Sequence, residues 1–319
     1  MDVAIRKTAD SVYILSNEPK DWLAAQSYAE GLIGTLSDGS TISANLVSIG
    51  SEQEQSIVGS FARDNFIYNS AFSVLYTAAD GGDAAYIWLG GSDLASEGSW
   101  VWSDGSPFAY SNWGRGGLWN GSGQNREPDD FNGQDTLAMG METWPYGYAT
   151  NQGLGDALQW NDIDESNKLP FMMEFAGDLT RVFIEGLAVA FDINGNAGIT
   201  AKILGAVFGA DQVSNKEYAG IGLDYLDNKG YSYEGLMDLA LKASGCVSNE
   251  DVVNKLYENV VGVTPTAEQA APFVSMLEGE TPLHTWGSLG VMAADLELLT
   301  TRIDLTGLAE TGLEYTPFG

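Results

Sequence analysis

Short apolar runs alternate with long polar stretches in the first 177 residues of the chain. Runs rich in aromatic and β-branched side chains, bounded by Gly, Asn, Asp or Ser, predict strands. The predicted strands are Val12–Leu15, Asn45–Ile49, Tyr86–Gly90, Trp100–Trp102, Thr136–Met141 and Pro170–Phe175. Between Ser103 and Trp160 the pattern predicts mostly loop, and a loop region of that length in a compact domain is typically functional.

Two helices are predicted in the same half. The first is Asp21–Glu30, because Trp22, Ala25, Ala29 and Leu32 recur at helical spacing and form one apolar face. Ser51 and Glu54 form a capping-box pattern that predicts a second helix ending near Phe66. Strands and helices together predict an α+β domain over residues 1–177.

From about residue 178 the apolar positions follow helical periodicity. The predicted helices are Leu179–Phe191, Thr200–Phe208, Asn215–Leu226, Tyr233–Ala243, Asn249–Val261, Thr266–Leu277 and Leu283–Thr301. Capping-box patterns mark three helix starts, at Ser214 with Glu217, Ser248 with Asp251, and Thr266 with Gln269. We therefore expect an all-α helical domain over residues 178–319, with a scaffolding or spacing role.

Charge and composition narrow the function. Fourteen Lys and Arg against 44 Asp and Glu give a net charge of −30, which opposes binding to nucleic acid and to anionic membranes. One Cys and one His exclude an intrachain disulfide and a Cys/His zinc cluster. No run approaches the ~18 apolar residues of a membrane span, so we expect no membrane insertion. The N-terminus lacks the apolar core of a signal peptide, and we expect the chain to be a piece of a longer protein.

Oxygen ligands gather in two segments, Glu127–Asp135 and Trp160–Asp162. Calcium takes about six to eight oxygen ligands from carboxylates and carbonyls. The expected metal ligands are Glu127, Asp129, Gln134, Asp135, Asn161 and Asp162. A cis bond at Pro128 would let its two acidic neighbours converge on one ion. The alternative is a polar surface loop that holds no ion.

A series of short motifs appears in a fixed order along the first half. They are Trp22…Ala25…Tyr28-Ala29…Gly31, Leu46-Val47-Ser48-Ile49, Trp88-Leu89-Gly90-Gly91, Glu97-Gly98-Ser99-Trp100, Asn112-Trp113, Glu127-Pro128-Asp129, Gln134-Asp135 and Trp160-Asn161-Asp162. In this order they resemble the C-type lectin fold over roughly residues 10 to 176. The resemblance implies a double-loop domain whose long loop holds calcium at the ligand-binding site. It also implies calcium ligands at Glu127, Asp129, Asn161 and Asp162, with Gln134 and Asp135 as additions.

The chain departs from the family pattern in two places. The paired cysteines of the animal members are missing, and the third residue of the Glu-Pro-Asn motif is Asp129. An amide donates hydrogen bonds, whereas a carboxylate only accepts them, so the change does not favour mannose-type recognition. A donor-rich ligand, or one whose own carboxylate enters the calcium shell, fits at least as well.

Aromatic side chains are expected beside this site. The expected ligand-binding residues are Glu127, Asp129 and Asn161, with Trp119, Trp144, Tyr146 and Tyr148 alongside them. Aromatic rings next to a polar anchor suit both peptide grooves and sugar faces. The alternative is that these rings pack the loops.

Catalysis is not expected, because His284 and Cys246 have no neighbours in the sequence that would activate them. Instead, the combination resembles the ligand-binding region of large RTX-type bacterial adhesins, which are exported by type I secretion and act in cell adhesion and biofilms. That resemblance implies an extracellular, cell-surface location and a peptide or protein ligand on another cell. A calcium-dependent carbohydrate-binding lectin and a structural module with a degenerate site are the two alternatives.

Overall fold

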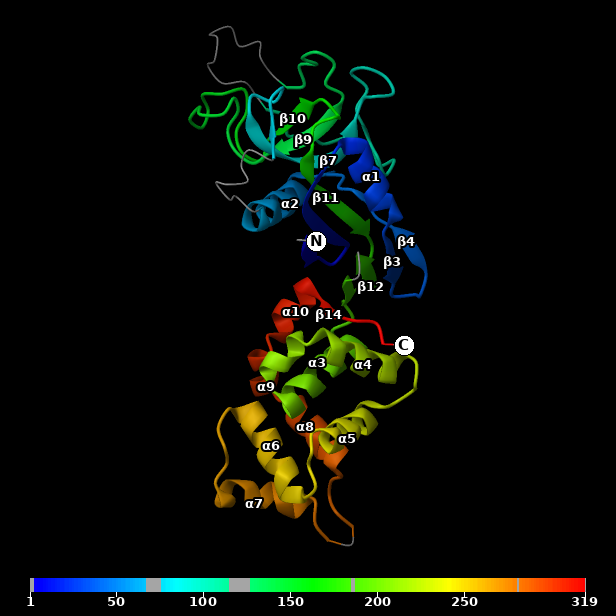
Figure 1. The fold of residues 1–319 in the computed structure, drawn as a ribbon, viewed down its shortest axis with the longest axis vertical. Coiled ribbons are helices and arrows are strands. Elements are labelled where there is room, and N and C mark those ends of the chain that lie inside the picture. Colours follow the sequence, from blue (N-terminus) through cyan, green and yellow to red (C-terminus); the bar gives the residue numbers. More distant parts are fainter. Residues whose placement is uncertain (1–2, 67–75, 115–126, 185–186, 280, 319) are drawn as a thin grey trace. The chain divides into compact units, whose positions relative to one another are not determined.

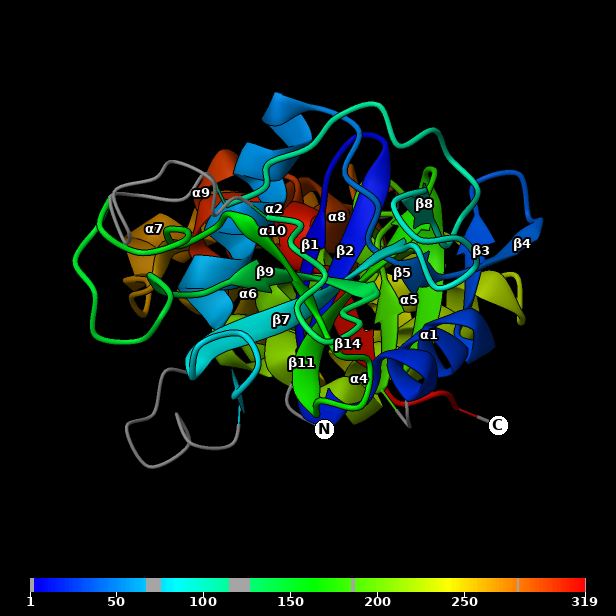
Figure 2. The same cartoon turned by 90° about the horizontal axis from the view of Figure 1, so that it is seen from above.

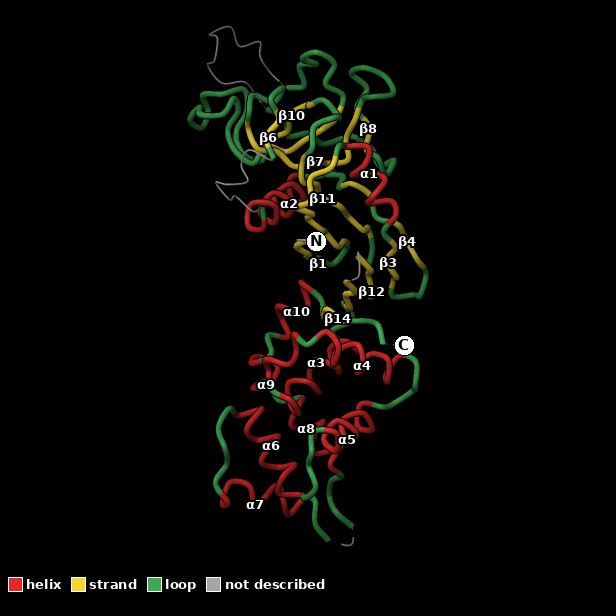
Figure 3. Tube along the Cα trace, in the orientation of Figure 1, coloured by secondary structure: helices red, strands yellow, loops and turns green. Residues whose placement is uncertain are grey.

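The computed structural model describes residues 3–66, 76–114, 127–184, 187–279 and 281–318. The chain divides into two compact units, Met1–Asp178 and Leu179–Gly319 (Figure 1). Strands predominate in the first unit and helices in the second (Figure 3). The predicted order, an α+β half followed by a helical half, is confirmed.

The first unit is built on a twisted sheet with strand order β1-β2-β11-β7-β9-β10. These strands are β1 (Val3–Lys7), β2 (Ser11–Lys20), β7 (Ala84–Ser92), β9 (Thr136–Gly140), β10 (Trp160–Ile163) and β11 (Leu169–Ala176). The pairings are antiparallel except that between β11 and β7, where Phe171 lies opposite Trp88. Short strands β5 (Asn45–Leu46), β6 (Thr77–Ala78) and β8 (Val101–Trp102) extend it, and β3 (Ile33–Leu36) and β4 (Thr41–Ser43) form a hairpin.

Two helices lie on opposite sides of the central strands β11 and β7 (Figures 1 and 2). Helix α1 (Trp22–Gly31) is capped by Asp21, and its buried face is the one that the sequence predicted. Helix α2 (Glu52–Asn65) is capped by Ser51, whose hydroxyl accepts the N–H of Glu54. Both helix predictions are confirmed, because each depended on local capping and periodicity.

The strands of this sheet also position the acidic segments that the sequence analysis identified. The connection between β7 and β9 contains the acidic segment Glu127–Asp135, and the segment Trp160–Asp162 lies on β10 itself. Beneath them, the rings of Trp102, Phe108, Trp113 and Trp160 pack together in edge-on and tilted contacts. Trp160 is completely buried, so the strand that carries Asn161 and Asp162 is anchored in this aromatic core.

The second unit consists mainly of helices around one apolar core. They are α3 (Asn196–Ile203), the π-helix η2 (Leu204–Phe208), the 3₁₀ helix η3 (Ala210–Ser214), α4 (Lys216–Asp227), α5 (Tyr233–Ala243), α6 (Asn249–Val261), α7 (Ala267–Met276), α8 (Trp286–Ala294), α9 (Glu297–Arg302) and α10 (Leu305–Thr311). The capping boxes at Ser248 and Thr266 are confirmed. None of the described helices is long and apolar enough to cross a lipid bilayer.

The predicted helix Leu179–Phe191 is wrong. This segment forms strands β12 (Leu179–Ile184) and β13 (Leu187–Ala190), and β13 pairs with β14 (Leu313–Tyr315) near the other end of the unit. Its Val, Ile, Phe and Thr side chains favour an extended backbone. The partner strand lies more than a hundred residues away along the chain, so no local sequence pattern could predict the pairing.

Three helix boundaries also differ from the prediction. Leu283–Thr301 is two helices, α8 and α9, separated at Asp295, whose carboxylate accepts hydrogen bonds from Lys202 Nζ at 2.8 Å and the Tyr233 hydroxyl at 3.4 Å. Thr200–Phe208 is the end of α3 followed by the π-helix η2. The cap of α4 is Asn215 and not Ser214, because the Asn215 side chain accepts the N–H of Tyr218.

Candidate metal centre and ligand-binding site

Three carboxylates from two separate segments meet at one point of the first unit. Glu127 and Asp129 precede β9, Asp162 lies on β10, and one carboxylate oxygen of each lies within 4.8 Å of the others. Asp162 is completely buried and Glu127 is 8% exposed, whereas Asp129 faces solvent. We call these three residues the Glu127 cluster. The sequence predicted that they converge, and the structure brings them together.

The loop that contains the cluster is fastened to β10 through Asp162. Its carboxylate accepts the backbone N–H groups of Asp129, at 3.0 and 3.2 Å, and of Asp130, at 2.7 Å. The Glu127–Pro128 peptide bond is cis. The side chain of Asp129 in turn accepts the N–H of Phe131 at 3.1 Å. Two carboxylates of the cluster are thus oriented by the backbone of the loop itself.

The cluster carries more negative charge than its surroundings stabilise. The pKa of Glu127 is raised to about 8, chiefly by burial and also by the charges of Asp129 and Asp162, against the opposing effect of a hydrogen bond from Trp144. Burial also raises the pKa of Asp162 to about 6, although the N–H groups of Asp130 and Asp129 stabilise its charged form. A cation among these oxygens would stabilise the ionised carboxylates.

Hard divalent cations fit this set of ligands. The carboxylate oxygens are of the kind that calcium prefers, and no sulfur or imidazole belongs to the group. In the part of the chain that the structure describes, no lysine or arginine forms an ion pair with any of the three carboxylates. The positive charge that balances these three carboxylates would therefore come from a bound ion.

Asn161, the fourth predicted ligand, is 4% exposed and lies beside Asp162 on β10. Its Nδ2 donates to the hydroxyl of Tyr86 at 3.0 Å. Glu127 has an aromatic neighbour too, because Trp144 Nε1 donates to Glu127 Oε1 at 3.1 Å. The rings of Tyr86 and Trp144 lie 5.6 Å apart, so two site residues have their hydrogen-bond partners in one buried aromatic pair.

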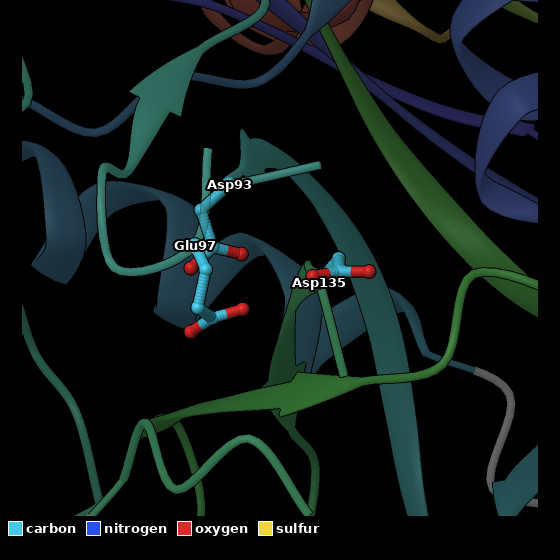
Figure 4. A group of neighbouring side chains, drawn as sticks. All are labelled: Asp93, Glu97 and Asp135. Carbon is cyan, nitrogen blue, oxygen red and sulfur yellow. The ribbon is translucent and has the colours of Figure 1, made fainter. Parts of the chain in front are cut away.

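A second acidic group lies nearby on the chain (Figure 4). Asp93 and Glu97 come from the segment after β7, and Asp135 comes directly before β9, with one carboxylate oxygen of each within 4.8 Å of the others. Asp93 is 2% exposed, and its Oδ2 accepts the N–H of Gly98 at 2.8 Å. Its Oδ1 is buried and has no hydrogen-bond partner among the residues that the structure describes. A buried carboxylate oxygen without a partner is costly, and a cation would satisfy it.

Two predicted ligands make their described contacts outside the Glu127 cluster. Asp135 belongs to the second group, which we call the Asp93 cluster. The Gln134 side chain donates to Asp80, to its backbone oxygen at 3.3 Å and to its carboxylate at 3.1 Å. Placing Gln134 and Asp135 with Glu127 is corrected accordingly. Positive φ angles at Asp130, Asn132 and Gly133 turn the chain between Asp129 and Gln134, so neighbours in the sequence need not share one site.

Sequence reasoning missed Asp93 and Glu97 as candidate ligands. Glu97 stands in one of the motifs that carry the resemblance, but only the antiparallel pairing of Ser92 with Thr136 brings it and Asp93 to Asp135. The backbone N–H of Asp93 donates to the Asp135 oxygen at 3.1 Å, which fixes the two segments side by side. The spacing of four residues between Asp93 and Glu97 in one loop was the sequence signal that could have identified them as ligands.

The predicted ligand-contacting aromatics have different positions. Trp119 lies outside the described residues. Trp144 is 1% exposed and supports Glu127 from below, so its ring is not available to a ligand, and that prediction is corrected. Tyr146 and Tyr148 are 62% and 42% exposed, as a ligand contact requires. Phe131, next to Asp129, is 58% exposed and was not predicted.

The residues considered for catalysis lie in the helical unit. Cys246 is buried, with its sulfur 3.6 Å from the Ser244 hydroxyl. The imidazole of His284 contacts the Ser288 hydroxyl at 3.2 Å, at the start of α8. Each position is explained by local packing and capping.

Comparisons with known proteins bear on the first unit. No family model matches the chain. Ladderlectin of Oncorhynchus mykiss is 31% identical over 83 residues, 26% of this chain and 32% of ladderlectin. The galactose-specific lectin nattectin of Thalassophryne nattereri is 49% identical over 35 residues, 11% of this chain and 22% of nattectin. The matched segments thus span about a third or less of these relatives.

Solved structures of similar fold include two with most of their length covered. Human lithostathine is 18% identical, with 55% of this chain and 89% of that chain aligned and a TM-score of 0.36. The C-type lectin CEL-I of Cucumaria echinata is 21% identical, with 55% and 96% aligned and a TM-score of 0.37. The two sequence relatives are named as lectins, which supports the C-type-lectin-like character expected for the first half.

Proposed function

We propose that the first unit is a calcium-dependent ligand-binding module, and that the Glu127 cluster with Asn161 holds the ion beside which the ligand docks. The carrying observation is the convergence of three carboxylates, two of them buried, from segments on either side of β9. Burying such charges without a counter-ion is unfavourable. Calcium provides the charge and accepts this kind of ligand.

An extended peptide is the ligand that we propose first. Asp129 is exposed and can only accept hydrogen bonds when ionised, so it complements a donor-rich partner such as the N–H groups of an extended backbone. Phe131, Tyr146 and Tyr148 present exposed rings on the loops of this unit. Exposed aromatic side chains are frequent anchors in peptide recognition.

A carbohydrate is the second candidate, and one specific observation favours it. Nattectin, which shares 49% identity over 35 residues, is named as galactose-specific. Sugar hydroxyl groups both donate and accept hydrogen bonds, and the C–H faces of sugar rings pack on aromatic side chains. The same ion and the same exposed tyrosines would serve either ligand, so the two candidates differ in the partner and not in the site.

The Asp93 cluster supports a second ion. Asp93 Oδ1 is buried without a hydrogen-bond partner in the described part of the chain, and carboxylate oxygens of Glu97 and Asp135 lie within 4.8 Å. We propose that Asp135 serves as a ligand there and not at the Glu127 cluster. A second ion would fix the loop after β7 against the loop before β9, and it would thereby stabilise the ligand-binding loops.

We propose the cellular role as that of a surface module in a larger secreted bacterial adhesin. A net charge of −30 suits an exterior rich in divalent cations, and one cysteine leaves calcium to perform the stabilising role that disulfides have in other extracellular domains. The helical unit would then scaffold or space the binding unit. These assignments rest on the sequence resemblance and are tested together with the ligand.

The test combines calcium titration with ligand screening. A peptide library and a glycan array are probed with the wild-type chain, with Glu127→Gln, and with Glu30→Gln as a control at an exposed position of α1. We expect a chelator and Glu127→Gln to abolish binding to the same ligands, and Glu30→Gln to leave it unchanged. Binding that persists in chelator would overturn the proposal, and absence of calcium binding by calorimetry would leave a structural module.

A further inference from the structure

Two buried aromatic residues, Tyr86 and Trp144, hold the polar side chains of the site from beneath. We propose that they are positioning residues. They turn Asn161 Oδ1 and one carboxylate oxygen of Glu127 toward the metal ion. The inference rests on the proposed function, since it concerns the same ion. It assigns Trp144 a role different from the ligand contact expected from sequence, and it gives Tyr86 a role for the first time.

The Tyr86 hydroxyl sets the direction of the Asn161 amide. It has one hydrogen, which it donates to the Gly81 backbone oxygen at 2.7 Å. The hydroxyl oxygen can then only accept, and it accepts Nδ2 of Asn161 at 3.0 Å. The amide group is thereby turned so that Oδ1 points away from Tyr86. Without this constraint the amide could present its NH₂ group, which cannot bind a cation.

The Trp144 indole sets the direction of the Glu127 carboxylate in a similar way. Nε1 donates to Oε1 at 3.1 Å in a buried environment, so Oε2 is the carboxylate oxygen that does not accept from the indole. The ring itself is held tightly, because a side chain at Gly140 or Gly155 would come within 2.5 or 2.1 Å of it. An indole that cannot move gives the carboxylate a fixed orientation.

The two rings support each other. Their centroids are 5.6 Å apart with an interplanar angle of 58°, and both side chains are fully or almost fully buried. Tyr86 is also confined by Gly81, where an added Cβ would lie 2.7 Å from the ring. Hydrogen-bonding partners that orient metal ligands typically contribute 10- to 100-fold to metal affinity. The rigid pair is built to supply that kind of contribution.

The first experiment removes one hydroxyl. Calcium binding is measured by calorimetry for wild type, Tyr86→Phe and Tyr76→Phe, taking the binding event that Glu127→Gln abolishes as the one of interest. Tyr76 is the matched control, because its buried hydroxyl also donates to a backbone oxygen, that of Asn17 at 2.9 Å. We expect Tyr86→Phe to weaken this event about 10-fold or more and Tyr76→Phe to leave it within about 2-fold.

A rescue variant separates orientation from general loosening. Asn161→Asp offers an oxygen to the ion whichever way the side chain turns, so its orientation no longer depends on Tyr86. In the Asn161→Asp background we therefore expect Tyr86→Phe to change calcium affinity by less than about 2-fold. A Tyr86→Phe effect of equal size in both backgrounds would show a structural role and overturn the inference for Tyr86.

The second experiment concerns the indole. Trp144→Phe is compared with Trp22→Phe, since Trp22 is 3% exposed and its Nε1 donates to the Leu89 backbone oxygen at 2.8 Å. Melting is followed in chelator and in millimolar calcium. Both variants should melt lower in chelator, but only Trp144→Phe should lose most of the calcium-induced rise. An equal calcium-induced rise in both variants would overturn the role of Trp144.

The outcomes distinguish the two levels of the argument. A wild-type chain that binds no calcium would remove the proposed function and the inference together. A wild type that binds calcium, with Tyr86→Phe and Trp144→Phe binding as their controls do, would remove the inference alone.

Discussion

The backbone N–H of Asp130 donates to the Asp162 carboxylate at 2.7 Å, although 32 residues separate them along the chain. This contact fastens an irregular loop to a strand of the central sheet. Because the backbone N–H groups of Asp129 and Asp130 both donate to this buried carboxylate, it can organise the loop before any ion arrives. A site that is largely formed in advance loses less conformational entropy when the ion binds.

Asp162→Asn should therefore affect both folding and metal binding. The amide has one acceptor oxygen in place of two and adds a donor opposite backbone N–H groups, so we expect a loss of about 1–3 kcal/mol in the free energy of unfolding in chelator. Calcium binding at the Glu127 cluster should be lost as well. Urea denaturation and calorimetry measure the two effects.

The exposed member of the cluster provides the comparison. Asp129→Asn should weaken calcium binding but leave the unfolding free energy in chelator nearly unchanged, because Asp129 is exposed and its amide oxygen can still accept the N–H of Phe131. Equal destabilisation by Asp162→Asn and Asp129→Asn would contradict the fastening role of Asp162.

Asp93→Asn tests whether the two acidic groups act separately. It removes the charge of the one buried carboxylate in the Asp93 cluster, while the Glu127 cluster keeps all its ligands. Calorimetry should show one calcium-binding event lost and the event that depends on Glu127 retained. Loss of both events together would indicate a single shared site, and an unchanged titration would show that the Asp93 cluster binds no ion.

The sequence predicted elements that depend on local signals. The helices Tyr233–Ala243 and Asn249–Val261 match the structure residue for residue, because apolar periodicity and strong caps define them. The segment Leu179–Phe191 was wrong because its strand pairing depends on Leu313–Tyr315. Propensity is a weak guide when a distant partner decides the conformation.

The candidate site likewise combines residues that the sequence could predict with residues that only the folded structure brings together. Glu127, Asp129 and Asp162 were predicted together from a resemblance that follows motif order, and the structure brings them together. Asp93 could not be assigned to Asp135 from spacing alone, because the register of β7 against β9 determines their distance. The burial of Trp144 likewise depends on the close approach of Gly114, Gly140 and Gly155 to its ring, and no periodic pattern in the sequence relates these glycines to it.

Gly220→Ala should destabilise the helical unit. A Cβ at this position of α4 would lie 1.8 Å from the Thr316 backbone oxygen, and the N–H of Thr316 donates to the Lys216 oxygen at 2.8 Å. Backbone must shift to admit the methyl group, so we expect a cost of about 1–3 kcal/mol. Gly31→Ala, where nothing lies within 4 Å, is the control and should be neutral or slightly stabilising. Comparable losses in both variants would contradict the close-approach argument.

The pH dependence of stability should carry a contribution from Glu174 on β11. Burial raises its pKa from 4.5 to about 7, the Ser11 hydroxyl opposes the rise with a 2.5 Å hydrogen bond, and Glu54 and Asp104 add to it. The folded state therefore binds more protons than the unfolded state between pH 4.5 and 7. The contribution of Glu174 to stability is fully present below about pH 4.5 and is lost as the pH rises through about 7.

In chelator, Glu174→Gln should remove this part of the slope, whereas Glu30→Gln should keep it. Urea denaturation at intervals from pH 4.5 to 8 measures the slope, and an identical slope in wild type and Glu174→Gln would show that Glu174 is ionised throughout that range.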